Sequence, residues 1–94
     1  MAVRNGQICP TFTQSKLTFE WEAIGSFTCK SAMTWVEKLA ADHVSPLGGE
    51  IALTNGPKGY HCYATLEKKG VASSGLCYKG TAAYPTSGFN WTGA

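Results

Sequence analysis

The chain is poor in charge, and it has neither a long apolar run nor a closely spaced cysteine pair. Charged residues make up 15% of its 94 residues, against roughly 25% in an average soluble protein. The net charge is +2 and the only adjacent basic pair is Lys68–Lys69, so no basic stripe for nucleic acid is present. No apolar run approaches the about 20 residues that span a bilayer. We therefore expect neither nucleic-acid binding nor membrane insertion.

The cysteines are even in number but widely spaced, and they lie at Cys9, Cys29, Cys62 and Cys77. Zinc sites usually draw their ligands from close pairs such as C-x₂-C, which this chain lacks. Four cysteines in a short chain instead predict two disulfides and an extracellular or periplasmic setting. We expect no metal and no cofactor.

Apolar spacing predicts one strand near the N-terminus and one helix after it. Residues 17–23 alternate apolar and polar side chains, the pattern of a half-buried strand. From Thr28 or Ser31 to Val44 the apolar residues recur at helical spacing. Thr28 can cap this helix, and Pro46 prevents its extension.

Three further strands are expected at residues 50–53, 60–66 and 71–79, with turn residues between them. The predicted fold class is α+β, with one helix packed on a small antiparallel sheet of three to four strands and two disulfides. Residues 1–8 are interpreted as a flexible or cloning-derived N-terminus. Residues 9–86 are expected to form one domain and 87–94 a tail or the start of a linker, as in a module of a longer protein.

The disulfide pairing is left open by the sequence, because four cysteines allow three connectivities. A four-residue loop at residues 68–71 would set Cys62 opposite Cys77. Cys62 could then join Cys77, with Cys9 joined to Cys29. We favour Cys29–Cys62 with Cys9–Cys77, because longer closed loops stabilise more in the entropic account of disulfides.

Residues for catalysis are scarce, and we predict none. A nucleophile needs a base within reach, but neither His43 nor His61 lies near a recognisable Ser or Cys motif. Glu20 and Glu22 are separated by roughly 7 Å on one strand face, a spacing near that of glycosidase carboxylates. Exposed carboxylates of this kind more often protect a sheet from aggregation.

The predicted binding residues are polar and aromatic side chains that alternate away from the core. Thr18, Glu20 and Glu22 should face outward from their strand, as should Tyr63 and Tyr78 from theirs. Exposed tyrosines are enriched at protein interfaces. These five residues form the candidate site for a protein partner.

The sequence also resembles a known family over roughly residues 25–80. Gly25-Ser26-Phe27 stands before Cys29 and the helix, and Tyr60-His61-Cys62 opens a later strand that is followed by a Gly-punctuated one. This arrangement resembles the small cysteine-paired modules in the minor coat (adsorption) proteins of filamentous bacteriophages. The well-known N-terminal modules of that family are small β-barrels with close cysteine pairs, whereas this chain is expected to hold a sizeable helix.

The resemblance implies a non-enzymatic module, exposed on the virion surface, that binds a host envelope protein during infection. The partner would be the periplasmic domain of TolA or a pilus, and the module itself a monomer. The mode that we expect is strand addition to an exposed sheet edge, either residues 17–23 or 71–79. The alternative is a secreted inhibitor or toxin that acts through the loop at Thr54–Lys58.

Overall fold

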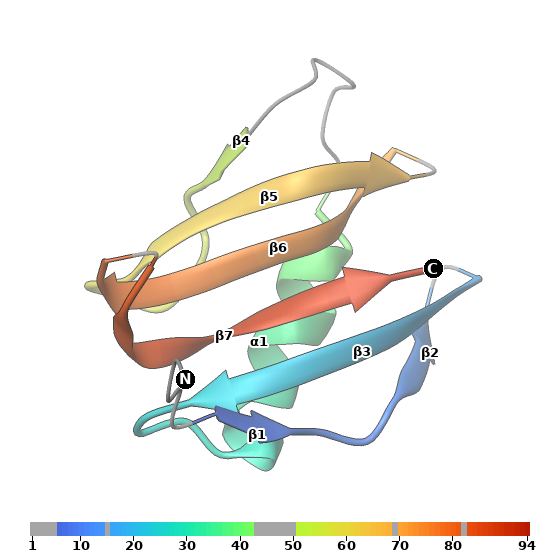
Figure 1. Cartoon of the computed structure of the whole chain (residues 1–94). Helices are drawn as coiled ribbons and strands as arrows, with labels where there is room; N and C mark the ends of the chain where they lie inside the picture. The colour runs from blue at the N-terminus through green and yellow to red at the C-terminus, as the bar shows by residue number, and fades with distance from the viewer. Residues whose placement is uncertain (1–5, 15, 43–50, 69, 82) are drawn as a thin grey trace.

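The computed structural model describes residues 6–14, 16–42, 51–68, 70–81 and 83–94, which form an antiparallel sheet and one helix (Figure 1). The helix α1 spans Cys29–Ala40. The strands are β1 (Gly6–Ile8), β2 (Phe12–Gln14), β3 (Leu17–Ile24), β4 (Ile51–Leu53), β5 (His61–Lys68), β6 (Val71–Gly80) and β7 (Pro85–Gly93).

The strand order is β1-β3-β7-β6-β5-β4, and β2 pairs with β3. The short strands β1 and β2 share one edge of β3, where β1 lies beside Glu22–Ile24 and β2 beside Leu17–Phe19. The opposite edge of the sheet is formed by β4, which pairs with only part of β5. Both strands that we expected at an edge, β3 and β6, are therefore interior strands, and that prediction was wrong.

The helix forms because its first turn is capped and one of its stripes is apolar. Thr28 Oγ1 accepts a hydrogen bond from the Ser31 backbone N–H at 3.1 Å, and Ser31 Oγ accepts one from the Thr28 N–H at 2.9 Å. The buried stripe consists of Ala32, Val36, Leu39 and Ala40. The predicted start at Thr28 is confirmed as the N-cap. The predicted extent to Val44 was too long, because the helix ends at Ala40 with Ala41 as its C-cap; Val44 itself lies outside the described residues.

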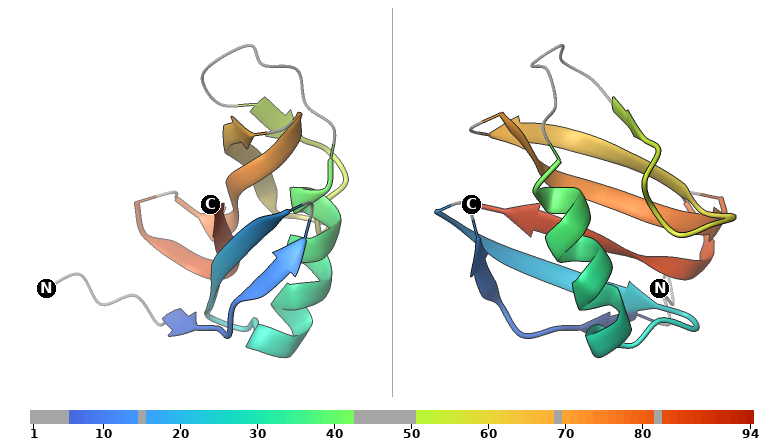
Figure 2. Two further views of the ribbon diagram at one scale, coloured as in Figure 1. Left: turned by 90° about the vertical axis from the view of Figure 1, so that its right-hand side faces the viewer. Right: turned by 180° about the vertical axis from the view of Figure 1, so that it is seen from behind.

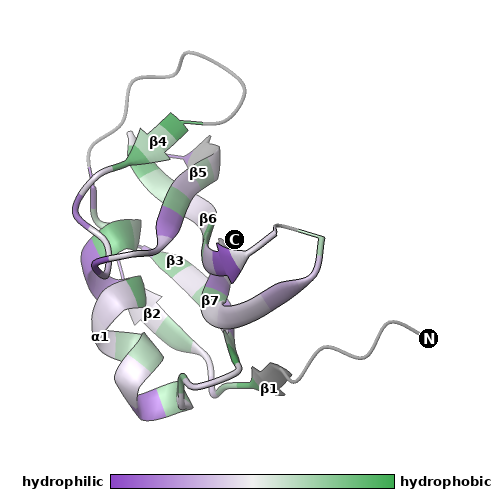
Figure 3. Cartoon of the chain, turned by 90° about the vertical axis from the view of Figure 1, so that its left-hand side faces the viewer, coloured by the Kyte–Doolittle hydropathy of each residue, from purple (hydrophilic) through white to green (hydrophobic). Residues whose placement is uncertain are grey.

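One face of the sheet packs on α1, which crosses in front of the interior strands in the right-hand view of Figure 2. Hydrophobic and hydrophilic segments alternate along these elements (Figure 3). In β3 the side chains of Phe19 and Trp21 are buried, while Thr18 and Glu20 are exposed. The core is thus a layer of aromatic side chains between the sheet and the helix.

The strand β7 lies between β3 and β6 and supplies two of the largest buried side chains, Phe89 and Trp91. Trp91 Nε1 donates a 2.9 Å hydrogen bond to the Ala72 carbonyl oxygen. Residues 87–94 are therefore not a tail: the structure places them in the middle of the sheet. Similarly, Gly6–Ile8, expected to be part of a flexible N-terminus, form β1.

The predicted fold class was wrong in its proportions. In the described part of the chain, seven strands and one 12-residue helix make a mostly β fold, not an α+β fold with three to four strands. The difference comes from β1, β2 and β7, which are short or rich in Gly, Pro, Ser and Thr and so lack a strong alternation of apolar residues.

The two disulfides join Cys9 to Cys29 and Cys62 to Cys77. The favoured pairing was wrong, because β5 and β6 place Cys62 directly opposite Cys77. This register is the one that the sequence predicted from the intervening loop. Two disulfides are typical of proteins in an oxidising compartment, outside the cell or in the periplasm.

Candidate binding face

The face of the sheet turned away from α1, which we call the open face, carries all five predicted binding residues. No helix or strand among the described residues covers it. One row of register partners crosses it through Ala52, Tyr63, Leu76, Asn90, Glu22 and Ile8. Beside this row lie the paired residues His61 and Tyr78, and the paired residues Glu20 and Thr92.

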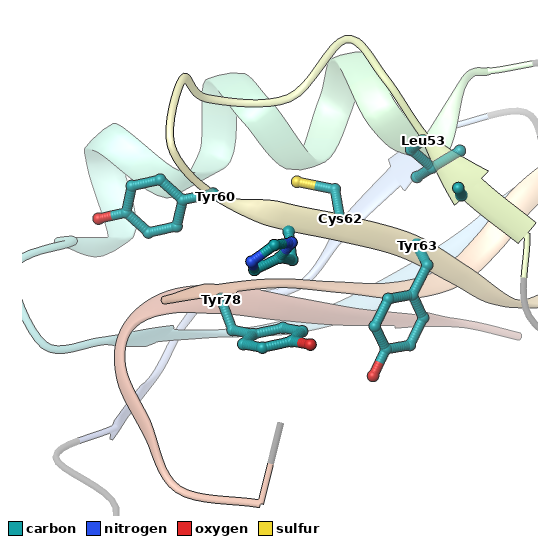
Figure 4. Close-up of a pocket in the computed structure, with 7 residues that line it drawn as sticks. Leu53, Tyr60, Cys62, Tyr63 and Tyr78 are labelled. Atoms are coloured by element: carbon teal, nitrogen blue, oxygen red, sulfur yellow. The ribbon is translucent and has the colours of Figure 1, made fainter. Parts of the chain in front are cut away.

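Two predicted residues, Tyr63 and Tyr78, meet at one end of this row. Their ring centroids are 6.0 Å apart and the rings are nearly perpendicular, at 83°. His61 lies beside Tyr78 with centroids 5.5 Å apart. Figure 4 shows both tyrosine rings on the side away from α1, whereas Cys62 Sγ points the other way.

These side chains border a cavity of about 500 Å³ at the β4 edge of the sheet, which we call the aromatic cleft. Its lining is formed by Ala52, Leu53, Tyr60, His61, Cys62, Tyr63 and Tyr78. Tyr63 and Tyr78 are half-buried, so each ring is held by its neighbours and still reaches solvent. Rings held in this way can bind apolar groups and cations with little loss of side-chain entropy.

The other three predicted residues lie on β3, away from the aromatic cleft. Glu20 and Glu22 border a second hollow of about 230 Å³, together with Ile8, Trp21, Asn90 and Thr92. We call it the acidic hollow. Asn90 Nδ2 donates a 3.0 Å hydrogen bond to Glu22 Oε1, which orients that carboxylate. Thr18 lies at the end of β3, where its backbone pairs with Ala94.

A loop on the other side of the sheet, at Thr54–Lys58, is firmly anchored. Asn55 Nδ2 donates a 2.9 Å hydrogen bond to Asp42 Oδ1. Gly56 packs so closely on the second disulfide that a Cβ atom there would lie 2.4 Å from Cys62 Sγ. Lys58 is exposed. The loop therefore presents its lysine from a fixed backbone.

Six members of the open face were not predicted as binding residues, namely Ile8, Ala52, His61, Leu76, Asn90 and Thr92. Leu76 and Asn90 occupy the centre of the face only because β7 pairs with β6, and the sequence interpretation did not include that strand. His61 was correctly placed opposite Cys62, but its contact with Tyr78 depends on the β5–β6 register. The repeated alternation Phe89-x-Trp91 is the signal that could have revealed the strand.

The described residues offer neither free thiols nor a cluster of metal-binding side chains. All four cysteines are oxidised, so none offers a thiol nucleophile. Within the described ranges, no group of three or more metal-binding side chains comes together. His43, considered as a base, lies outside those ranges.

In the part of the chain that the structure describes, no helix is sufficiently long and apolar to cross a membrane. Comparisons with protein-family models, with curated proteins and with solved structures give no match for this chain.

Proposed function

We propose that this chain is a non-enzymatic binding module that engages a partner protein through its open face. The observation that carries the proposal is the pair Tyr63 and Tyr78, half-buried and in edge-to-face contact at the border of the aromatic cleft. Interfaces obtain much of their binding free energy from a few aromatic side chains of this kind. The polar residues on the rest of the face then form the rim of the contact.

The partner that we propose is a host envelope protein, either the periplasmic domain of TolA or a pilus. The module would belong to the adsorption protein of a filamentous phage and be exposed on the virion surface. The support for this identification is the sequence resemblance over residues 25–80, together with the two disulfides, which suit an oxidising compartment.

The mode of binding follows from the position of the strands. Strand addition at β3 or β6 is excluded, because both have neighbours on each side. Contact through side chains of the open face requires no free backbone edge. We therefore place the interface on the face of the sheet and not on its rim.

Replacing Tyr63 or Tyr78 with alanine should weaken binding of the TolA periplasmic C-terminal domain about 10- to 30-fold, as for interface hot spots. The measurement is isothermal titration with the oxidised protein. Tyr84→Ala is the matched control, because Tyr84 is an exposed tyrosine (79%) outside the aromatic cleft. If Tyr84→Ala weakened binding as much as the other two, the interface would not lie on this face.

A second candidate function, inhibition of a partner enzyme, is favoured by the anchored loop at Thr54–Lys58. Inhibitory loops work best when their backbone is held before binding, because less entropy is lost on association. The hydrogen bond from Asn55 and the packing of Gly56 on the disulfide provide such a restraint.

Lys58→Ala separates the two functions. For an inhibitor, it should reduce affinity for the target enzyme about 30-fold or more, because an exposed anchor side chain is lost. For an adsorption module, it should leave the TolA titration unchanged, since Lys58 does not border the aromatic cleft or the acidic hollow. The open-face interface would be contradicted if the Lys58→Ala variant kept its melting temperature but no longer bound TolA.

A further inference from the structure

The aromatic cleft, at the β4 edge of the sheet, and the acidic hollow lie toward opposite ends of one row of residues on the open face. Tyr63 borders the aromatic cleft and Glu22 borders the acidic hollow. Between them the row passes through Leu76 and Asn90, so the two ends are three strand spacings apart. At about 4.8 Å per spacing, this separation is roughly 14 Å. A single ligand segment can therefore reach both hollows.

The charged residues of the interior strands are unevenly placed. β3 carries Glu20 and Glu22, β5 carries Glu67 and Lys68, β6 carries Lys79, and β7 carries none. Lys79 Nζ lies 4.8 Å from the ring centroid of Tyr60, so one ring that lines the aromatic cleft already has a cation over it. The open-face side chains of these strands thus offer carboxylates at one end, and tyrosine rings at the other.

Both ends favour a cation. A carboxylate attracts a positive group and accepts hydrogen bonds from it. The faces of tyrosine rings attract cations through the ring quadrupole, and arginine makes such contacts more often than lysine. Arginine also binds carboxylates with two parallel hydrogen bonds. The acidic hollow and the aromatic cleft are therefore two subsites for the same chemical group.

We propose that the open face binds an extended, basic segment of its partner, with one guanidinium in the aromatic cleft and a second against Glu20 and Glu22. The proposal rests on the function proposed above and names the chemistry of the partner. Because an extended chain advances about 3.4 Å per residue, a span of roughly 14 Å places the two arginines four residues apart. The residues between them pass over Leu76 and Asn90.

The test uses small peptides and the ¹⁵N-labelled, oxidised protein, followed by NMR. The probe is an acetylated and amidated pentapeptide with arginines at its two ends and three serines between them. One control peptide has the same composition but adjacent arginines. The other has glutamates in place of both arginines. The expected result is amide shifts near Tyr63 and Tyr78 and also near Glu22 and Asn90, with the spaced arginine peptide binding about two- to fivefold more tightly than the adjacent one.

Two variants test whether the affinity for the arginine peptide depends on the carboxylates of the acidic hollow. Glu20→Gln should weaken the spaced arginine peptide about two- to fivefold and reduce the shifts near Glu22. Glu37→Gln, which removes one exposed carboxylate from α1, is the matched control and should change nothing. Equal loss in both variants would show a general effect of net charge and would overturn the proposal. So would equal binding of all three peptides, or shifts confined to one hollow.

The outcomes also distinguish this proposal from the proposed function. If the spaced arginine peptide binds as expected but neither TolA nor a pilus protein binds, the identity of the partner is wrong and the chemistry of the surface stands. Alternatively, TolA binds through Tyr63 and Tyr78 while the peptides cause no amide shifts and Glu20→Gln leaves TolA affinity unchanged. In that case the binding function stands, and the proposal of a basic ligand segment is refuted.

Discussion

A variant that lacks residues 85–94 is expected to lose its tertiary structure altogether. These residues include the whole of β7, which separates β3 from β6 in the sheet. Phe89 and Trp91 each bury about 150–250 Å², which at about 25 cal/mol per Å² corresponds to about 4–6 kcal/mol per side chain. A domain of this size is stable by only about 5–14 kcal/mol. The check is near-ultraviolet circular dichroism together with the dispersion of amide proton signals.

Point variants refine this prediction. Trp91→Ala should lower the free energy of unfolding by about 3–5 kcal/mol, because it empties a buried site and removes the hydrogen bond to the Ala72 carbonyl. Thr92→Ala is the matched control on the same strand, and its exposed side chain should cost less than about 1 kcal/mol. A truncated chain with native near-ultraviolet dichroism, or a Thr92→Ala variant as unstable as Trp91→Ala, would refute the central position of β7.

Reduction of both disulfides is expected to unfold most of the protein at 37 °C. In the loop-entropy account, a disulfide that closes a loop of 15 to 20 residues stabilises by about 3 kcal/mol. Together the two contribute about 6 kcal/mol, which is comparable with the whole stability expected of a 94-residue chain. Thermal melting of the oxidised and reduced proteins, followed by circular dichroism, measures the loss.

Paired substitutions identify which disulfide matters for which part of the fold. Replacing Cys62 and Cys77 together with alanine should lower the free energy of unfolding by about 3 kcal/mol, and the same change at Cys9 and Cys29 should have a similar effect. Proteolysis under oxidising conditions should yield the peptide pairs 9–29 and 62–77. Recovery of a peptide that joins Cys9 to Cys77 would contradict the structure.

Much of the local structure could be predicted from the sequence. The helix start at Thr28, the strand at Leu17 and the opposed positions of Cys62 and Cys77 all follow from side-chain spacing and turn residues, and the structure confirms them. These features depend on residues close in sequence. The same reasoning correctly placed Glu20 and Glu22 on the outward side of β3, because alternation along a strand is a local property.

The last strand was missed, because its glycines and proline, which are typical of linkers, were given more weight than the alternation of Phe89 and Trp91. Gly88 is required for another reason. Its φ is 148°, and a Cβ atom at this position would lie 2.0 Å from the Cys77 carbonyl oxygen. The glycine therefore permits close packing of β7 on β6 rather than flexibility. Only the pairing of distant strands reveals this requirement.

The pairing of the cysteines was wrong because one general argument was preferred to a specific one. Loop entropy favours long closures, such as Cys9 with Cys77. The hairpin of β5 and β6 already brings Cys62 and Cys77 together, with 4.1 Å between their Cα atoms. The hairpin register decides which cysteines pair. Loop entropy determines only how much each disulfide stabilises the fold. The outward positions of Tyr63 and Tyr78 were easier to predict, since both follow from alternation along the strands of this hairpin.

The position of β7 also sets the order in which the fold can be completed. Its partner β3 lies far away in the chain, and Asn90 bonds Glu22 across 68 positions. Contacts between such distant residues form late and slow the folding reaction. A chain that leaves a ribosome or a translocation channel from its N-terminus therefore exposes Phe19 and Trp21 until residues 85–93 have emerged. The aromatic core of this chain therefore cannot close before residues 85–93 are free to pair with β3 and β6.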